Sequence, residues 1–66
     1  MRKWVGKWRF NNVMDGHHGL TGSATVSAPN EFEAREAIRC AASREMFGTT
    51  MMQRYVEIQN ISIKTY

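Results

Sequence analysis

The sequence has a single cysteine, Cys40, and this scarcity excludes an internal disulfide. Small secreted domains usually depend on disulfides, so we expect this chain to work in a reducing cytoplasm. Long apolar runs are missing as well, because none approaches the roughly 20 residues that a membrane-spanning helix needs. A signal peptide is not apparent either. The sequence therefore predicts a cytoplasmic protein with no membrane contact.

Residue sets that support catalysis or metal binding are also scarce. Asp15, His17 and His18 are candidate metal ligands, but neighbouring histidines in an extended chain point apart and no fourth ligand is placed nearby. Cys40 with a histidine would be a nucleophile pair, yet Cys40 falls within an expected helix. The sequence has no glycine-rich phosphate loop and no carboxylates spaced for acid–base work. We therefore predict that the protein is not an enzyme and holds neither a metal nor a cofactor.

The chain has 66 residues, which is enough for one domain, residues 1–66. A domain this small buries a limited share of its surface, so its stability is marginal unless something reinforces it. With a disulfide excluded and no structural zinc site apparent, a homodimer or docking on a larger partner remains as a source of buried area. The chain begins at Met1, and we expect it to be a complete small gene product.

Two segments alternate apolar and polar residues with the period of a β-strand. In residues 2–10 one face carries Trp4, Gly6, Trp8 and Phe10, and the other carries Lys3, Val5, Lys7 and Arg9. In residues 20–28 one face carries Leu20, Gly22, Ala24, Val26 and Ala28, and the other carries Thr21, Ser23, Thr25 and Ser27. Residues 11–19 between them contain Asp15-Gly16, a strong turn dipeptide. The pattern predicts a β-hairpin with one buried and one wet face.

The residues that follow predict one helix. Asn30 stands at the N-cap position with Glu33 three residues later, and Glu31 and Glu33 complement the positive helix end. Gly48 is the expected C-cap. An apolar stripe of mostly small side chains consists of Ala34, Ala37, Ile38, Ala41 and Ala42. The residues expected away from this stripe are Arg35, Glu36, Arg39, Ser43 and Arg44.

The last part of the chain is extended again. Val56 and Ile58 share one parity, with Tyr55 on the other, and beyond Asn60 the apolar parity flips to Ile61 and Ile63. Such a flip indicates a β-bulge or a break between two strands. Short connections favour antiparallel neighbours. We therefore predict an α+β fold in the order β-β-α-β, a small antiparallel sheet of three or four strands with one α-helix packed on one face.

The positive charge is concentrated near the start of the chain. Nine Lys and Arg against six Asp and Glu give a net charge of +3, and no acid precedes Asp15. Such a local field favours an anionic partner such as nucleic acid or a nucleoprotein, although lysines on a sheet also simply deter aggregation. The candidate partner-binding residues are Lys3, Lys7 and Arg9, with Tyr55 and the helix residues Arg35 and Arg39 as further candidates.

A strand that runs into an alanine-rich helix, and then an aromatic-Gly-Thr step into another strand, spans Ala24 to Glu57. The runs that carry this pattern are Ala24-Thr25-Val26-Ser27-Ala28, Glu33-Ala34-Arg35-Glu36-Ala37-Ile38, Ala41-Ala42-Ser43-Arg44-Glu45, Phe47-Gly48-Thr49 and Tyr55-Val56-Glu57. Over this part the chain resembles small phage-encoded anti-CRISPR proteins of the type I-F inhibitor kind. The resemblance implies a non-catalytic inhibitor in the bacterial cytoplasm. Such an inhibitor occupies the surface of a CRISPR ribonucleoprotein where target DNA or a nuclease would bind.

The residues themselves support a second interpretation, a small basic nucleic-acid-binding or transcription-modulating protein. Lys3, Lys7 and Arg9 would then lie in a row on the outer sheet face. Their expected neighbours on that face are Thr21, Ser23, Thr25 or Tyr55. Neutralising phosphates in this way makes binding depend on salt concentration.

Overall fold

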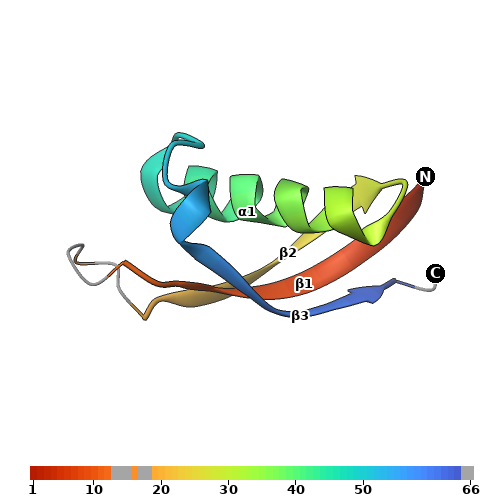
Figure 1. Cartoon of the computed structure of the whole chain (residues 1–66), viewed down its shortest axis with the longest axis horizontal. Coiled ribbons are helices and arrows are strands. Elements are labelled where there is room, and N and C mark those ends of the chain that lie inside the picture. The colour runs from red at the N-terminus through yellow and green to blue at the C-terminus, as the bar shows by residue number, and fades with distance from the viewer. Residues whose placement is uncertain (13–15, 17–18, 65–66) are drawn as a thin grey trace.

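The structure is a computed structural model that describes residues 1–12, 16 and 19–64. Within these residues, three strands form an antiparallel sheet, and one α-helix lies across a single face of it (Figure 1). The elements are β1 (Arg2–Phe10), β2 (Thr21–Ala28), α1 (Glu31–Phe47), a short 3-10 helix η1 (Gln53–Tyr55) and β3 (Val56–Ile63). The strand order is β2-β1-β3, so the first strand of the chain lies in the centre. The predicted α+β fold is confirmed.

The strand register sorts the side chains onto two faces. Trp4 of β1 pairs with Val26 of β2, and Lys7 pairs with Ser23 on one side and Asn60 on the other. Residues directly opposite in neighbouring strands point to the same face. Trp4 and its partners therefore face α1. Lys7 and its partners face away from it, on what we call the outer face.

The parity flip in the last strand is a β-bulge. The register between β1 and β3 shifts between Lys7 and Trp8, and Gln59 is the extra residue in β3. One added residue reverses the alternation beyond it. Ile58 and Ile61, three positions apart, consequently face the same side of the sheet and pack against the core.

The two ends of α1 lie where the capping residues predict. The side chain of Asn30 accepts a hydrogen bond from the backbone N–H of Glu33 at 2.9 Å. Gly48 has a left-handed backbone with φ of 73°, and its N–H donates to the carbonyl of Arg44 at 2.8 Å. Residues with a side chain disfavour that conformation, so glycine ends the helix at low cost.

The core lies between α1 and the inner face of the sheet. Trp8, Phe10 and Ile38 are essentially inaccessible to solvent. Small residues let the helix approach these rings closely: Ala42 is buried in the same cluster. Gly6 leaves room for Ile38, because a Cβ added there would lie 2.5 Å from the Ile38 Cδ1 atom. The aromatic side chains of β1 thus form the floor of the core, as predicted.

Ser43 corrects one sequence-based expectation, because it is fully buried rather than exposed. The chain beyond Gly48 folds back over the last turn of α1. The Ser43 hydroxyl donates to the carbonyl of Thr49 and accepts from the backbone N–H of Met52 at 3.3 Å. One buried hydroxyl therefore connects the helix to the turn that leads into η1.

Replacing Ser43 with alanine is expected to lower the free energy of unfolding by about 1–3 kcal/mol, because the backbone groups of Thr49 and Met52 lose their partner. Urea denaturation followed by circular dichroism measures the change. Ser27→Ala, on the exposed outer face, is the matched control and should stay within about 0.5 kcal/mol of the unmodified protein. Equal losses in the two variants would show that the Ser43 hydrogen bonds do not stabilise the fold.

Candidate partner-binding surface

The outer face of the sheet gathers the candidate cations of β1. Lys3, Lys7 and Arg9 are exposed and lie on the same side, because alternate residues of a strand share a face. A step of two residues along a strand covers about 6.8 Å, which is the backbone spacing between Lys7 and Arg9. Half-buried Val5 occupies the position between Lys3 and Lys7. We call Lys3, Lys7 and Arg9 the basic row.

Hydroxyl and amide side chains flank the basic row on both sides. The exposed residues opposite it on β2 are Thr21, Ser23, Thr25 and Ser27. On β3 its exposed neighbours are Glu57, Asn60 and Ser62. Glu57 is the one carboxylate among the described outer-face residues, and it stands directly opposite Arg9. The positive potential is therefore strongest around Lys3 and Lys7, farther from that acid.

The aromatic rings of β1 lie on the other side of the sheet. Trp4, Trp8 and Phe10 are buried in the core, and the described outer-face residues include no aromatic side chain. Sheets that read single-stranded bases expose aromatic rings for the bases to stack on. This face therefore suits contact with phosphate or carboxylate groups rather than with stacked bases.

A pocket of about 340 Å³ opens beside the middle of the basic row. Its lining residues are Lys7, Trp8, Thr21, Gly22, Ser23 and Gln59. Gln59 is not among the residues that the sequence pattern predicts to bind a partner, because period-two parity treats it as an ordinary strand residue. The parity flip near Asn60 was the signal that could have identified Gln59 as the bulge residue beside Lys7.

Tyr55 does not lie on the outer face, which corrects its expected place beside the basic row. Residues 53–55 form a 3-10 turn, so the strand parity that begins at Val56 does not extend back to them. The Tyr55 ring instead meets the ring of Phe10 edge-on, with the centroids 6.1 Å apart. The Arg54 guanidinium lies 5.2 Å from the centre of the same ring.

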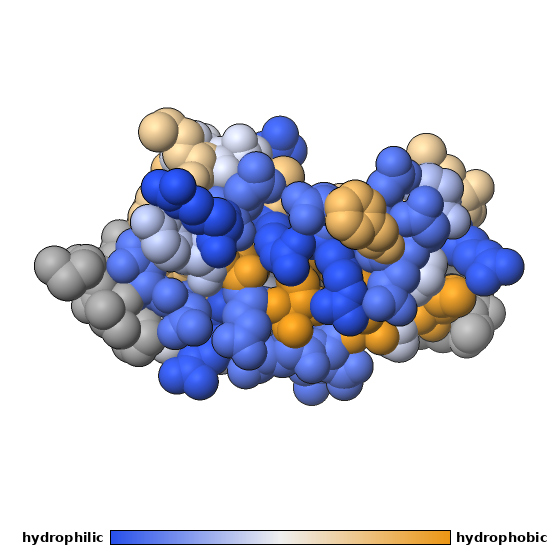
Figure 2. Space-filling view, viewed as in Figure 1, coloured by the Kyte–Doolittle hydropathy of each residue, from blue (hydrophilic) through white to orange (hydrophobic). Residues whose placement is uncertain are grey.

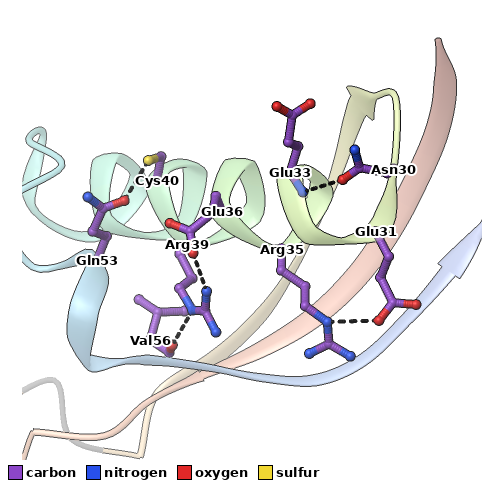
Figure 3. Close-up of polar contacts among 9 residues, drawn as sticks. All are labelled: Asn30, Glu31, Glu33, Arg35, Glu36, Arg39, Cys40, Gln53 and Val56. Atoms are coloured by element: carbon purple, nitrogen blue, oxygen red, sulfur yellow. Dashed lines mark hydrogen bonds and ion pairs between the residues drawn. The ribbon is translucent and has the colours of Figure 1, made fainter.

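The two helix arginines point toward β3, as Figure 3 shows. Arg39 donates from Nε to the carbonyl of Val56 at 3.2 Å and from Nη1 to Glu36 at 2.8 Å. Arg35 pairs with Glu31 at 3.0 Å. Arg39 thus links α1 to β3 through its hydrogen bond to Val56. The predicted partner-binding residues therefore lie in separate parts of the molecule. Among them, the fold brings only the basic row together on one exposed face.

The side of the molecule between α1 and β3 has a different chemistry. Figure 2 shows apolar residues gathered between the helix and the strand, with hydrophilic residues above and below them. Ile63 faces the helix side of the sheet but remains 39% exposed, and Phe32 on α1 is 73% exposed. The helix therefore leaves this edge of the core partly uncovered, and the surface there is apolar rather than basic.

The sequence also named candidate metal ligands and a candidate nucleophile. Asp15, His17 and His18 lie outside the described residues. Cys40 is half-buried, and its thiol donates to the Gln53 Oε1 atom at 2.7 Å (Figure 3). In the part of the chain that the structure describes, no three His, Cys, Asp or Glu side chains gather as a metal site. The described helices also include none long and apolar enough to cross a membrane.

No known protein family, curated protein or solved structure matches this chain. Its own surface chemistry is therefore the guide to its partner. Of the surfaces above, the outer face combines a row of cations of one sign with hydrogen-bonding side chains on both flanks. That combination is typical of a surface that binds an anionic partner.

Proposed function

We propose that this chain is a small non-enzymatic inhibitor that binds a nucleic-acid-containing complex in the cytoplasm of a bacterial host. The basic row carries the proposal: three cations stand along the central strand of an exposed face that is otherwise rich in hydroxyl and amide groups. The sequence resemblance to type I-F anti-CRISPR proteins makes a CRISPR surveillance ribonucleoprotein the first partner to test.

The charge arrangement suits this task for a kinetic reason. A surface of one charge sign raises the rate of encounter with an oppositely charged partner by about 10–1,000-fold. A phage-type inhibitor must reach its target before target DNA or a nuclease does, so fast association is the property on which its success depends. Occupying the partner's surface then excludes the competitor, and no bond needs to be made or broken.

Phage plating tests the proposal. Expression of the chain in cells with an active type I CRISPR system is expected to restore plating of a phage that the system targets. The control is the same phage on cells whose CRISPR genes are deleted, where expression should change nothing. If expression restores plating against no type I subtype, the assignment to CRISPR inhibition is overturned.

A further inference from the structure

The pocket beside Lys7 brings together polar side chains of the outer face. Its volume of about 340 Å³ lies at the lower end of the roughly 300–1,000 Å³ of small-molecule sites, so it suits one compact group. Its polar lining comes from every strand of the described sheet: Lys7 from β1, Thr21 and Ser23 from β2, and Gln59 from β3. The β-bulge is what makes Gln59 available beside Lys7.

The polar side chains of this lining can all donate hydrogen bonds. The Lys7 ammonium carries three donors, the amide of Gln59 two, and each hydroxyl of Thr21 and Ser23 one. The described lining residues include no carboxylate that would neutralise the ammonium. A cation with neutral donors on either side complements an anion that presents several acceptor oxygens.

We infer that this pocket binds one phosphate group of the nucleic-acid backbone in the partner complex, an inference that rests on the proposed function. A phosphodiester carries its charge on two non-bridging oxygens, and the tetrahedral phosphorus spreads these and the two ester oxygens out of one plane, so that they can meet donors arriving from different strands. A carboxylate holds its two oxygens in one plane and fits such a spread of donors less well. Lys3 and Arg9 continue the row on either side of Lys7, where adjoining phosphates of the same backbone would lie.

Contact limited to the backbone has a consequence for specificity. Phosphate contacts position a protein on nucleic acid without reading its sequence. The described outer face also lacks the aromatic rings on which bases stack. We therefore expect binding that is sensitive to salt and nearly independent of base sequence.

Fluorescence anisotropy with labelled DNA and RNA oligonucleotides tests the pocket through two matched double variants. Thr21→Val with Ser23→Ala removes the hydroxyls of the pocket without changing charge. Thr25→Val with Ser27→Ala makes the same substitutions on the same face of β2, outside the pocket lining. The first variant should bind about tenfold more weakly, because each hydrogen bond to the charged phosphate contributes to affinity and two of them are lost. The second should lose clearly less affinity, because neither of its hydroxyls lines the pocket and Ser27 stands opposite Lys3 instead.

A salt series on Lys7→Gln gives an independent readout. Losing one phosphate contact should lower the slope of log affinity against log salt by roughly one, whereas Arg44→Gln on the exposed end of α1 should leave the slope unchanged. Polyglutamate as a competitor distinguishes phosphate from carboxylate. If it displaces the labelled DNA as well as unlabelled DNA does at equal charge, the phosphate assignment is overturned.

The outcomes separate the pocket from the proposed function. Equal affinities of the two double variants would overturn the assignment of the pocket as a phosphate site, and the plating result would still stand. Absence of any binding of the unmodified protein to DNA and RNA at low salt would also overturn the phosphate assignment. Intact phosphate binding in a protein that never restores plating would count against CRISPR inhibition alone.

Discussion

Trp8→Ala is expected to leave the chain largely unfolded at room temperature. Trp8 is 1% exposed and belongs to the main buried cluster, whose other members are Phe10, Ile38, Ala42 and Val56. Truncating a buried tryptophan costs about 3–5 kcal/mol. A core in a domain of this size supplies about 3–5 kcal/mol of net stability in total. The loss therefore matches the whole stability, and circular dichroism together with amide NMR dispersion would report it.

Two companion variants identify lost packing as the cause. Val5→Ala lies on the same strand but on the outer face, half-buried, and should cost about 1 kcal/mol or less. Trp8→Phe keeps a ring in the core and breaks no hydrogen bond, because the buried Trp8 Nε1 atom has no partner among the described residues. It should fold with reduced stability. A Trp8→Ala protein that melts cooperatively near the normal temperature would contradict the place of Trp8 in the core.

Reversing the basic row, with glutamate at Lys3, Lys7 and Arg9, is expected to abolish the proposed CRISPR inhibition while the protein stays folded. These side chains are exposed, and surface substitutions usually change stability by within about 0.5 kcal/mol each. Interface charges act mainly on association, so the association rate with the surveillance complex should fall by about tenfold or more. Surface plasmon resonance measures that rate, and thermal melting verifies the fold.

A control variant equalises the change in net charge. Lys3→Glu with Lys7→Glu can be compared with Arg44→Glu and Arg54→Glu, two exposed arginines outside the outer face. The first pair should slow association far more than the second. If both pairs bind alike, charge acts only globally. The interface would then lie elsewhere, with the helix side that carries Arg35 as the next surface to test.

Local patterns were sufficient to predict most of the fold. Alternation in residues 2–10 separates the core side of β1 from its wet side, and the caps Asn30 and Gly48 mark the helix ends. Ser43 and Tyr55 were misplaced for one shared reason. Both depend on how the chain folds back after Gly48, which is a tertiary event that neither helical nor strand periodicity records.

The candidate surface was predictable only in part, because periodicity orders the residues of one strand but does not align neighbouring strands. Parity along one strand is enough to put Lys3, Lys7 and Arg9 on a common wet face. The pocket depends on which residues of different strands stand side by side, as Lys7 and Ser23 do. That register depends on strand pairing and on the bulge at Gln59, so it emerges only when the whole sheet is assembled.

The central position of β1 ties the completion of folding to the end of the chain. β1 is synthesised before β3, yet one of its two edges pairs only with β3. Trp4 therefore gains its partner Ile63 only when residues from almost the opposite end of the sequence are present. Contacts between such distant residues form slowly, because closing a long loop costs entropy before the contact stabilises it. A growing chain can therefore form its hairpin and helix early. Until residues 56–63 are added, the edge of β1 along which β3 lies (Figure 1) has no partner strand, and the inner rings of β1 lack cover on that side.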